Sequence, residues 1–248
     1  MPDVQGWRRK FGVIAPSTNT VVQPDLEAMR PHGVTNHTSR IFTPNAGAVS
    51  NETFRAGAEI IAANVADAVR SVMTCAPDYL VMGMSAVTFF DGKPGCDHFI
   101  RSVEEVAGIG VSVGSESCRA ALEAYGGVKR IAILSPYWPA MNTEVARYFG
   151  DVGFTVTRDI ALRCTSWTAI AEVTEARCIE ALRELDGDDV DAIVQVGTNL
   201  SMVRLAPYAE LWLGKPVIAI NTATYWHALR TNGIADRMDG FGRLLSEF

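Results

Sequence analysis

Small polar residues follow short apolar runs at several places in this chain. Hydroxyl and amide side chains, together with backbone N–H groups at helix starts, can bind carboxylate or phosphate oxygens without a lysine. The clusters therefore predict recognition of a small anion, provided that the fold brings them together. They are Ser17-Thr18-Asn19, Gly83-Met84-Ser85, Ser115-Glu116-Ser117, Pro136-Tyr137-Trp138, Gly197-Thr198-Asn199 and Asn221-Thr222.

Tyr137 is the strongest single candidate for a catalytic role. Its hydroxyl can donate a hydrogen bond to a carboxylate or enolate oxygen, and an ordinary phenol pKa of about 10 keeps it protonated at neutral pH. The other candidate contacts to substrate have a simpler alternative role, because Ser, Thr and Asn commonly cap helix starts. These candidates are Asn19, Thr18, Ser85, Thr198 and Asn199, and Met84, beside Ser85, is a further candidate contact.

A second group of residues is able to transfer protons. Glu116, Asp91, Asp97 and His98 lie near predicted loops, and any of them is a possible general base if its environment tunes its pKa. Cys96 follows the Gly83 loop and is a possible displaced nucleophile. The alternative for Cys96 is a buried thiol that behaves as a small hydrophobe, and we favour that interpretation.

Apolar β-branched runs alternate with longer amphipathic stretches, which is typical of parallel sheets with covering helices. The runs are nearly continuous in hydrophobicity, so both faces of each strand are expected to be covered. The predicted strands are 11–15, 78–83, 110–114, 130–134, 191–196 and 216–220, and the clearest predicted helices are 52–73, 142–153 and 175–185.

An internal repeat divides the chain into two similar parts. Residues 8–19 parallel 127–138, residues 77–87 parallel 190–200, and residues 111–122 parallel 217–229, in the same order. We take Gly83 and Gly197, near the ends of the strands in the second pair of segments, as equivalent positions. We therefore predict two pseudo-symmetric, flavodoxin-like α/β halves, the first of residues 1–118 plus 221–248 and the second of residues 119–220. Because ligands bind beyond the carboxyl ends of parallel strands, the site is expected between the halves.

Composition argues against several classes of protein. The 248 residues are 48% hydrophobic and 20% charged, as in ordinary globular proteins, and the formal net charge of −6 disfavours a nucleic-acid partner. The five cysteines form no CxxC pair and the four histidines are far apart, so no metal is expected. No phosphate-binding glycine motif follows a strand, so no cofactor is expected. Without a signal peptide or membrane segment, we expect a cytoplasmic protein, and homo-oligomerisation stays open.

Several of these segments resemble the aspartate/glutamate racemase superfamily, and most closely its branch of maleate cis-trans isomerases and arylmalonate decarboxylases. The similar segments are APSTNT (15–20), MGMSAVTFFDG (82–92), SPYWPAMN (135–142), GTNL (197–200), LGKPVIAINTATYWHALR (213–230) and GFGRLLSEF (240–248). This branch works without a metal or organic cofactor and uses one or two cysteines at the ends of equivalent strands. In this chain those positions hold Gly83 and Gly197, so the resemblance implies a member that lacks the family thiols.

The parts of the family site that hold the substrate are better matched. The resemblance implies that a carboxylate is held by Ser85, by Tyr137 and by the backbone amides of Thr198 and Asn199, while Met84 replaces a hydroxyl residue. Asn19 matches an asparagine that binds a substrate carboxylate in the maleate isomerase branch.

The expected function is that of a cofactor-independent lyase or isomerase. It would act beside the carboxylate of a small mono- or dicarboxylic acid, through an enolate held by hydroxyls and amides. One alternative is a hydrolase or hydratase in which Glu116, Asp91 or His98 activates a water. Another is a non-catalytic carboxylate-binding protein, and fold alone does not decide among the three.

Overall fold

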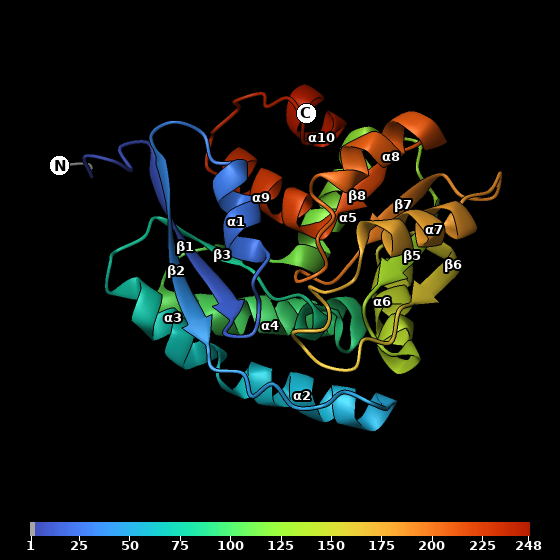
Figure 1. The fold of residues 1–248 in the computed structure, drawn as a ribbon. Helices are drawn as coiled ribbons and strands as arrows, with labels where there is room; N and C mark the ends of the chain where they lie inside the picture. The colour runs from blue at the N-terminus through green and yellow to red at the C-terminus, as the bar shows by residue number, and fades with distance from the viewer. Residues whose placement is uncertain (1–2) are drawn as a thin grey trace.

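Two parallel four-stranded sheets form the framework of the molecule (Figure 1), as seen in a computed structural model that describes residues 3–248. The first sheet has the order β2-β1-β3-β4 and the second has the order β6-β5-β7-β8. The same order in both sheets confirms the fold class that the repeat predicted. The strands are β1 (Arg9–Pro16), β2 (Val34–Ile41), β3 (Tyr79–Met82), β4 (Val111–Ser112), β5 (Arg130–Ser135), β6 (Thr155–Ala161), β7 (Ala192–Gln195) and β8 (Val217–Ala219).

Helices pack on the sheets and bury their apolar sides. In the first sheet, α3 contacts β1 and β2 while α9 contacts β3 and β4; in the second, α6 and α7 contact β6. The predicted helix 52–73 is in fact two helices, α2 and α3, interrupted at Asn64. The helices are α1 (Val22–Ala28), α2 (Asn51–Ala63), α3 (Val65–Met73), the 3-10 helix η1 (Ala86–Phe89), α4 (Gly92–Ala107), α5 (Gly114–Tyr125), α6 (Pro139–Asp151), α7 (Glu175–Leu185), α8 (Leu205–Leu213), α9 (Ile220–Thr231) and α10 (Arg243–Glu247).

Two strands escaped sequence-based prediction. β2 and β6 each lie at the edge of a sheet. Their sequences, VTNHTSRI and TVTRDIA, are rich in polar residues, and most of their side chains are partly exposed. An edge strand is covered less completely than a central one, so it lacks the continuous hydrophobic run on which the prediction relied.

The expected junction between the halves, at residues 118 and 119, falls inside helix α5. Helix α9 packs on α5, α1, β3 and β4, and so joins the C-terminal segment to the first sheet. The division into 1–118 plus 221–248 and 119–220 stays a prediction about domains.

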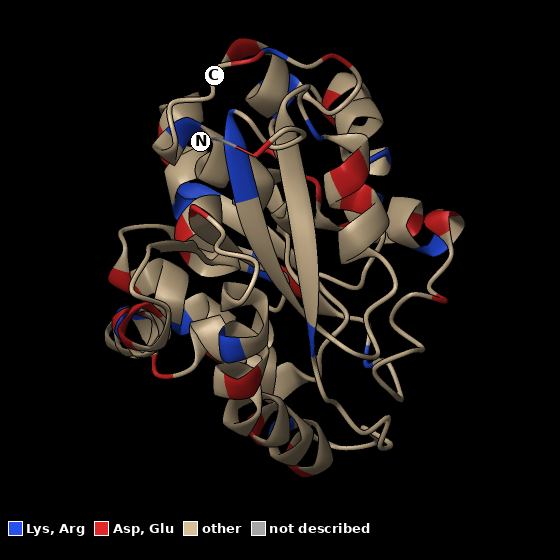
Figure 2. Ribbon diagram, turned by 90° about the vertical axis from the view of Figure 1, so that its left-hand side faces the viewer, with Lys and Arg blue, Asp and Glu red and all other residues tan. Residues whose placement is uncertain are grey.

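Charged residues lie mainly on the outer helices and loops. In the view of Figure 2, acidic and basic residues are interspersed on the helices, and the two long strands in front carry charge only near their ends. Among residues 3–248, no helix combines the length and the hydrophobicity that a membrane crossing requires.

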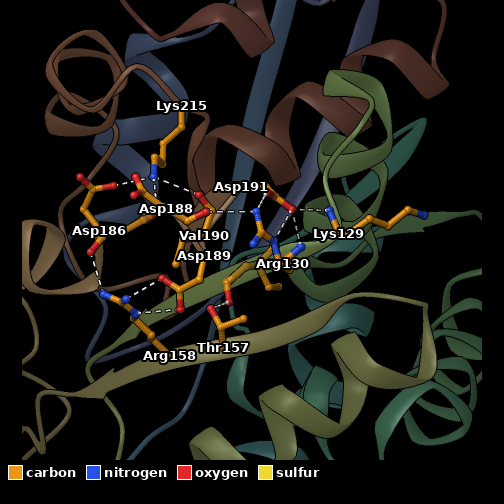
Figure 3. A network of polar contacts seen from close by, with 12 residues as sticks. Lys129, Arg130, Thr157, Arg158, Asp186, Asp188, Asp189, Val190, Asp191 and Lys215 are labelled. Atoms are coloured by element: carbon orange, nitrogen blue, oxygen red, sulfur yellow. Dashed lines mark hydrogen bonds and ion pairs between the residues drawn. The ribbon is translucent and has the colours of Figure 1, made fainter.

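The two sheets share an aspartate anchor at their amino-terminal edge. Asp78 accepts a hydrogen bond from the Lys10 backbone N at 2.8 Å, and Asp191 accepts one from the Arg130 backbone N at 2.7 Å. Lys10 lies near the start of β1, and Arg130 begins β5, so the repeat extends to single hydrogen bonds. In the second sheet the anchor belongs to a larger network of charged residues that includes Arg158 and Lys215 (Figure 3).

Candidate functional site

A cavity lies where the strand-end loops of the two sheets meet. One part of its lining is polar, from the loops after β1, β3, β5 and β7, and consists of Thr18, Asn19, Ser85, Tyr137, Thr198 and Asn199. The rest is mostly apolar and includes Ala58, Ile61, Met84, Val87, Trp167 and Ile170. The structure therefore brings together the candidate contacts from four of the six predicted clusters, whereas Ser115-Glu116-Ser117 and Asn221-Thr222 are not on the described lining.

A hydroxyl pair joins the two halves at the cavity. Ser85 Oγ and Tyr137 Oη are 2.8 Å apart, and both residues are 2% exposed. Burial raises the pKa of Tyr137, so its hydroxyl stays protonated. The pair has two hydroxyl protons and uses one in its mutual hydrogen bond, so the other is free for a ligand. Phe54 of α2 packs against the Tyr137 ring, with 5.4 Å between centroids.

Asn19 both caps a helix and faces the cavity. Its Oδ1 accepts hydrogen bonds from the backbone N of Val21, just before helix α1, and of Val22, the first residue of that helix. Its Nδ2 donates to Thr198 Oγ1 at 3.2 Å, and that hydroxyl donates to the Gly83 carbonyl at 2.9 Å. The second N–H of the Asn19 amide is left for a ligand. The capping and binding interpretations are therefore compatible.

The side chain of Asn199 is fully used within the protein. Its Oδ1 accepts a hydrogen bond from the Thr20 backbone N at 3.0 Å, and its Nδ2 donates to the Trp167 carbonyl at 2.9 Å. These bonds tie the loop after β1 to the segment that carries Trp167. Only the backbone N–H of Asn199 remains to contact a ligand, which is the contact that the sequence predicted.

The two glycines differ in their surroundings. Gly197 lines the cavity with a φ of +97°, and a Cβ there would lie 2.4 Å from Pro136 Cδ. Gly83 lies beside the cavity, and a Cβ there would lie 2.7 Å from Val22 Cγ1. Neither backbone position accommodates a larger side chain without movement.

The repeat alignment of these glycines needs a correction. Gly83 N donates to the Ile14 carbonyl, whereas the matching bond in the second sheet is from Val196 N to the Leu134 carbonyl. Gly83 is thus equivalent to Val196, and Gly197 is one residue further along. Gly197 is therefore the counterpart of Met84 rather than of Gly83, and it has a positive φ of 97°.

The structure does not bring the candidate acids, bases and thiol to the cavity. Asp91 and His98 line a separate groove between α3 and α4, and the Asp91 side chain is 81% exposed. Cys96 is fully buried with its Sγ 3.1 Å from Ser115 Oγ, and burial raises the pKa of its thiol to about 11. Glu116 accepts a hydrogen bond from Tyr148 Oη at 2.5 Å and one from a neighbouring arginine. These contacts turn the side chains toward other helices.

The apolar walls are the part of the site that sequence reasoning missed. Ala58 and Ile61 come from α2, and Trp167 and Ile170 come from the irregular segment after β6. The chain just before α2 is linked to this irregular segment by an isolated bridge between Gly47 and Ser166. Trp167, a single tryptophan in a largely polar loop, was the only local feature of the sequence that pointed to these walls.

The lining is also unusual in its charge. Within residues 3–248, the cavity is lined by no lysine, arginine, histidine, aspartate, glutamate or cysteine. In the same range, no three histidine, cysteine or acidic side chains are grouped in a way that suits a metal ion. The arrangement offers hydrogen-bond donors beside mostly apolar walls, where a bound anion interacts with them more strongly than in water.

Two pseudo-equivalent sheets with an uncharged polar cavity between their strand-end loops define a class of α/β enzyme-like folds, and comparison with known proteins identifies the class. The family model for arylmalonate decarboxylase matches residues 11–245. The chain belongs to this family. Among curated proteins, the maleate isomerase of Nocardia farcinica is 26% identical over 249 residues and covers 96% of each chain. The arylmalonate decarboxylase of Bordetella bronchiseptica is 27% identical over 170 residues, covering 67% of this chain and 70% of its own.

Solved structures show the same fold. A cysteine-to-serine mutant of Nocardia farcinica maleate cis-trans isomerase, with a covalently bound succinylcysteine intermediate, superposes with a TM-score of 0.87. It is 24% identical and is matched over 97% of this chain and 99% of its own. A liganded double mutant of arylmalonate decarboxylase has a TM-score of 0.79 at 22% identity, over 97% of this chain and 100% of its own.

Proposed function

We propose that this protein is a lyase of the arylmalonate decarboxylase type, acting on a small acid whose retained carboxylate lies at the polar end of the cavity. The observation that carries the proposal is the buried pair of Ser85 and Tyr137, contributed by different halves and facing the same cavity as the Asn19 amide. Such donors stabilise charge that develops on the carboxylate oxygens as it becomes an enolate.

Decarboxylation suits this lining better than racemisation or thiol addition. When the bond to the leaving carboxylate breaks, its electron pair moves onto the α-carbon and into the retained carboxylate, and CO₂ departs. No base is needed for this step. The enolate then takes a proton at carbon from a hydroxyl donor or from water. Racemisation needs a base and thiol addition needs a cysteine, whereas Tyr137 is the only titratable residue on the described lining, and burial keeps it protonated.

The apolar walls indicate the substrate class. A second carboxylate placed near Ile61, Trp167 and Ile170 would lose its hydration, and its departure as uncharged CO₂ would relieve that cost. The same walls suit an apolar substituent on the α-carbon. We therefore propose substituted malonates as substrates, which is narrower than the small carboxylic acids expected from sequence.

Three alternatives have weaker support. A hydrolase or hydratase that uses Glu116, Asp91 or His98 would need one of these side chains at the cavity, and the described lining includes none of them. A non-catalytic carboxylate-binding protein would use the same donors but would release no CO₂. Maleate isomerisation is a third possibility, drawn from the relatives, and is tested by the appearance of fumarate.

The first experiment is a screen of phenylmalonate, alkylmalonates and maleate, followed by proton NMR. We expect phenylmalonate to be converted to phenylacetate and CO₂. Tyr137→Phe should lower kcat by about 10²–10³ with little loss of thermal stability, because the ring still packs while one oxyanion donor is lost.

Tyr225→Phe is the matched control for that variant. Tyr225 is also fully buried, and among the described residues its hydroxyl has one hydrogen-bond partner, Asn36, at 3.1 Å and away from the cavity. It should retain wild-type kcat. Wild-type turnover by Tyr137→Phe would disprove the role assigned to this hydroxyl. Asn19→Ala is a less specific test, because it removes the cap of α1 as well as a ligand contact.

A further inference from the structure

Two buried amide side chains hold the backbone of the loop after β7. Gln195, which is 1% exposed, donates from Nε2 to the carbonyls of Val196 and Gly197, each at 2.8 Å. Asn221, which is 3% exposed, donates from Nδ2 to the Thr198 carbonyl at 2.9 Å. Three successive carbonyls are therefore bound by amide groups.

The orientation of both amides is determined by their partners. Nε2 of Gln195 faces two carbonyls, and its Oε1 accepts a hydrogen bond from the Ile220 N. Nδ2 of Asn221 faces the Thr198 carbonyl and a carboxylate oxygen of Asp25, at 2.8 Å. Exchanging oxygen and nitrogen in either side chain would place acceptors against acceptors.

This arrangement controls where two backbone N–H groups point. In a trans peptide the C=O and the following N–H point in opposite directions. The Gly197 carbonyl faces Gln195, so the Thr198 N–H points away from Gln195; likewise the Asn199 N–H points away from Asn221. Both Thr198 and Asn199 line the cavity. Within residues 3–248, neither N–H donates to a protein acceptor.

We propose that Gln195 and Asn221 are positioning residues that aim the Thr198 and Asn199 amides at the substrate carboxylate. The inference rests on the proposed function. A buried amide in a strand is costly unless its hydrogen bonds are satisfied, and an apolar residue would fill the same space in β7. Within residues 3–248, Gln195 satisfies its donors only through this loop, so its contribution is to the loop conformation.

The test compares Gln195→Met with wild type, since methionine has similar length but no amide donors. With phenylacetate as the probe, we expect the wild-type Thr198 and Asn199 amide resonances to shift in ¹H–¹⁵N NMR spectra and the variant to show much smaller shifts. The dissociation constant should rise about tenfold. With phenylmalonate, kcat should fall by about 10²-fold, because misaimed donors stabilise the transition state poorly.

Thr224→Val is the matched control. Thr224 is 2% exposed and donates from Oγ1 to the Ile220 carbonyl at 2.7 Å, within helix α9 and off the cavity. It should lose some stability but keep wild-type binding and kcat. If Gln195→Met does not fold, Asn221→Ala tests the second carbonyl, with the Asn199 resonance as the readout.

The outcomes separate the two proposals. If wild type neither binds phenylacetate nor converts any acid, the proposed function fails and the positioning role falls with it. If wild type binds and turns over, but the Gln195 or Asn221 variant matches it in amide shifts and kcat, only the positioning role is disproved.

Discussion

At the scale of single residues, polar side chains around the cavity do more than one task. Asn19 caps α1 through its oxygen and faces the cavity through its nitrogen. The Asn199 side chain instead uses its hydrogen bonds to connect two loops. Helices that start at strand ends have free N–H groups, so the same residue types are needed for capping and for anion binding. Residue type therefore locates the site, but the hydrogen-bond partners decide which atoms are available.

Asp25 supports a prediction about pH at this scale. Burial raises its pKa to about 6, whereas an aspartate in the unfolded chain titrates near 3.9. Because the folded pKa is the higher one, its contribution to stability is complete below about pH 4 and is lost as the pH rises through about 6. Asp25→Asn removes this loss and keeps an acceptor for Asn221. Its urea midpoint should exceed that of wild type at pH 8.

The advantage of Asp25→Asn should vanish at pH 4. Asp67→Asn is the control, because the Asp67 side chain is 85% exposed and forms only a surface pair with Arg70. If the urea midpoints of Asp25→Asn and wild type differ by the same amount at pH 4 and pH 8, the raised pKa of Asp25 is not the cause of the difference.

At the scale of elements, the connections between strands and helices shape the cavity. In the connection after β7, Gly197 takes the left-handed conformation. Side chains strain such a conformation, so glycine at this position serves the loop whatever the catalytic chemistry.

Gly197→Ala should therefore destabilise the protein by about 1–3 kcal/mol, because a Cβ would be strained by the positive φ and would press on Pro136. Phenylacetate binding should weaken as well, since the neighbouring amides move. Gly150→Ala is the control: Gly150 lies in helix α6, and a Cβ added there would have open space around it, so alanine should leave stability equal or higher. Urea denaturation measures the stability of both variants. A neutral effect of Gly197→Ala would show that the loop can relax.

At the scale of the whole molecule, the two sheets repeat one plan and contribute donors to one cavity from their carboxyl ends. Asp78 and Asp191 hold the opposite edge of the two sheets in the same way. Because the cavity loops and the anchors lie at opposite ends of the strands, the anchors can be tested for stability without disturbing ligand binding.

Asp191→Asn should lower the free energy of unfolding by about 1–3 kcal/mol at pH 7, as expected for hydrogen bonds to a charged group. The Arg130 guanidinium and backbone hold the pKa of Asp191 well below its usual range. Its contribution is therefore present above about pH 4 and is lost as the pH falls toward the folded pKa. Denaturation at several pH values checks this, with Asp188→Asn as the control. If the difference in the free energy of unfolding between Asp191→Asn and wild type is the same at pH 2 as at pH 7, this account of Asp191 is wrong.

Local sequence determined the central strands, the polar loops that follow them and the repeat, because continuous apolar runs and strand-end residues are properties of neighbouring positions. Those loops supplied Tyr137, Ser85 and the Thr198 amide. The edge strands β2 and β6 needed the tertiary structure, since partial exposure weakens their pattern. The cavity walls at Ile61 and Trp167 also needed the tertiary structure, as did the orientation of the Glu116 side chain toward Tyr148. These features depend on contacts between segments far apart in the chain, which no local periodicity records.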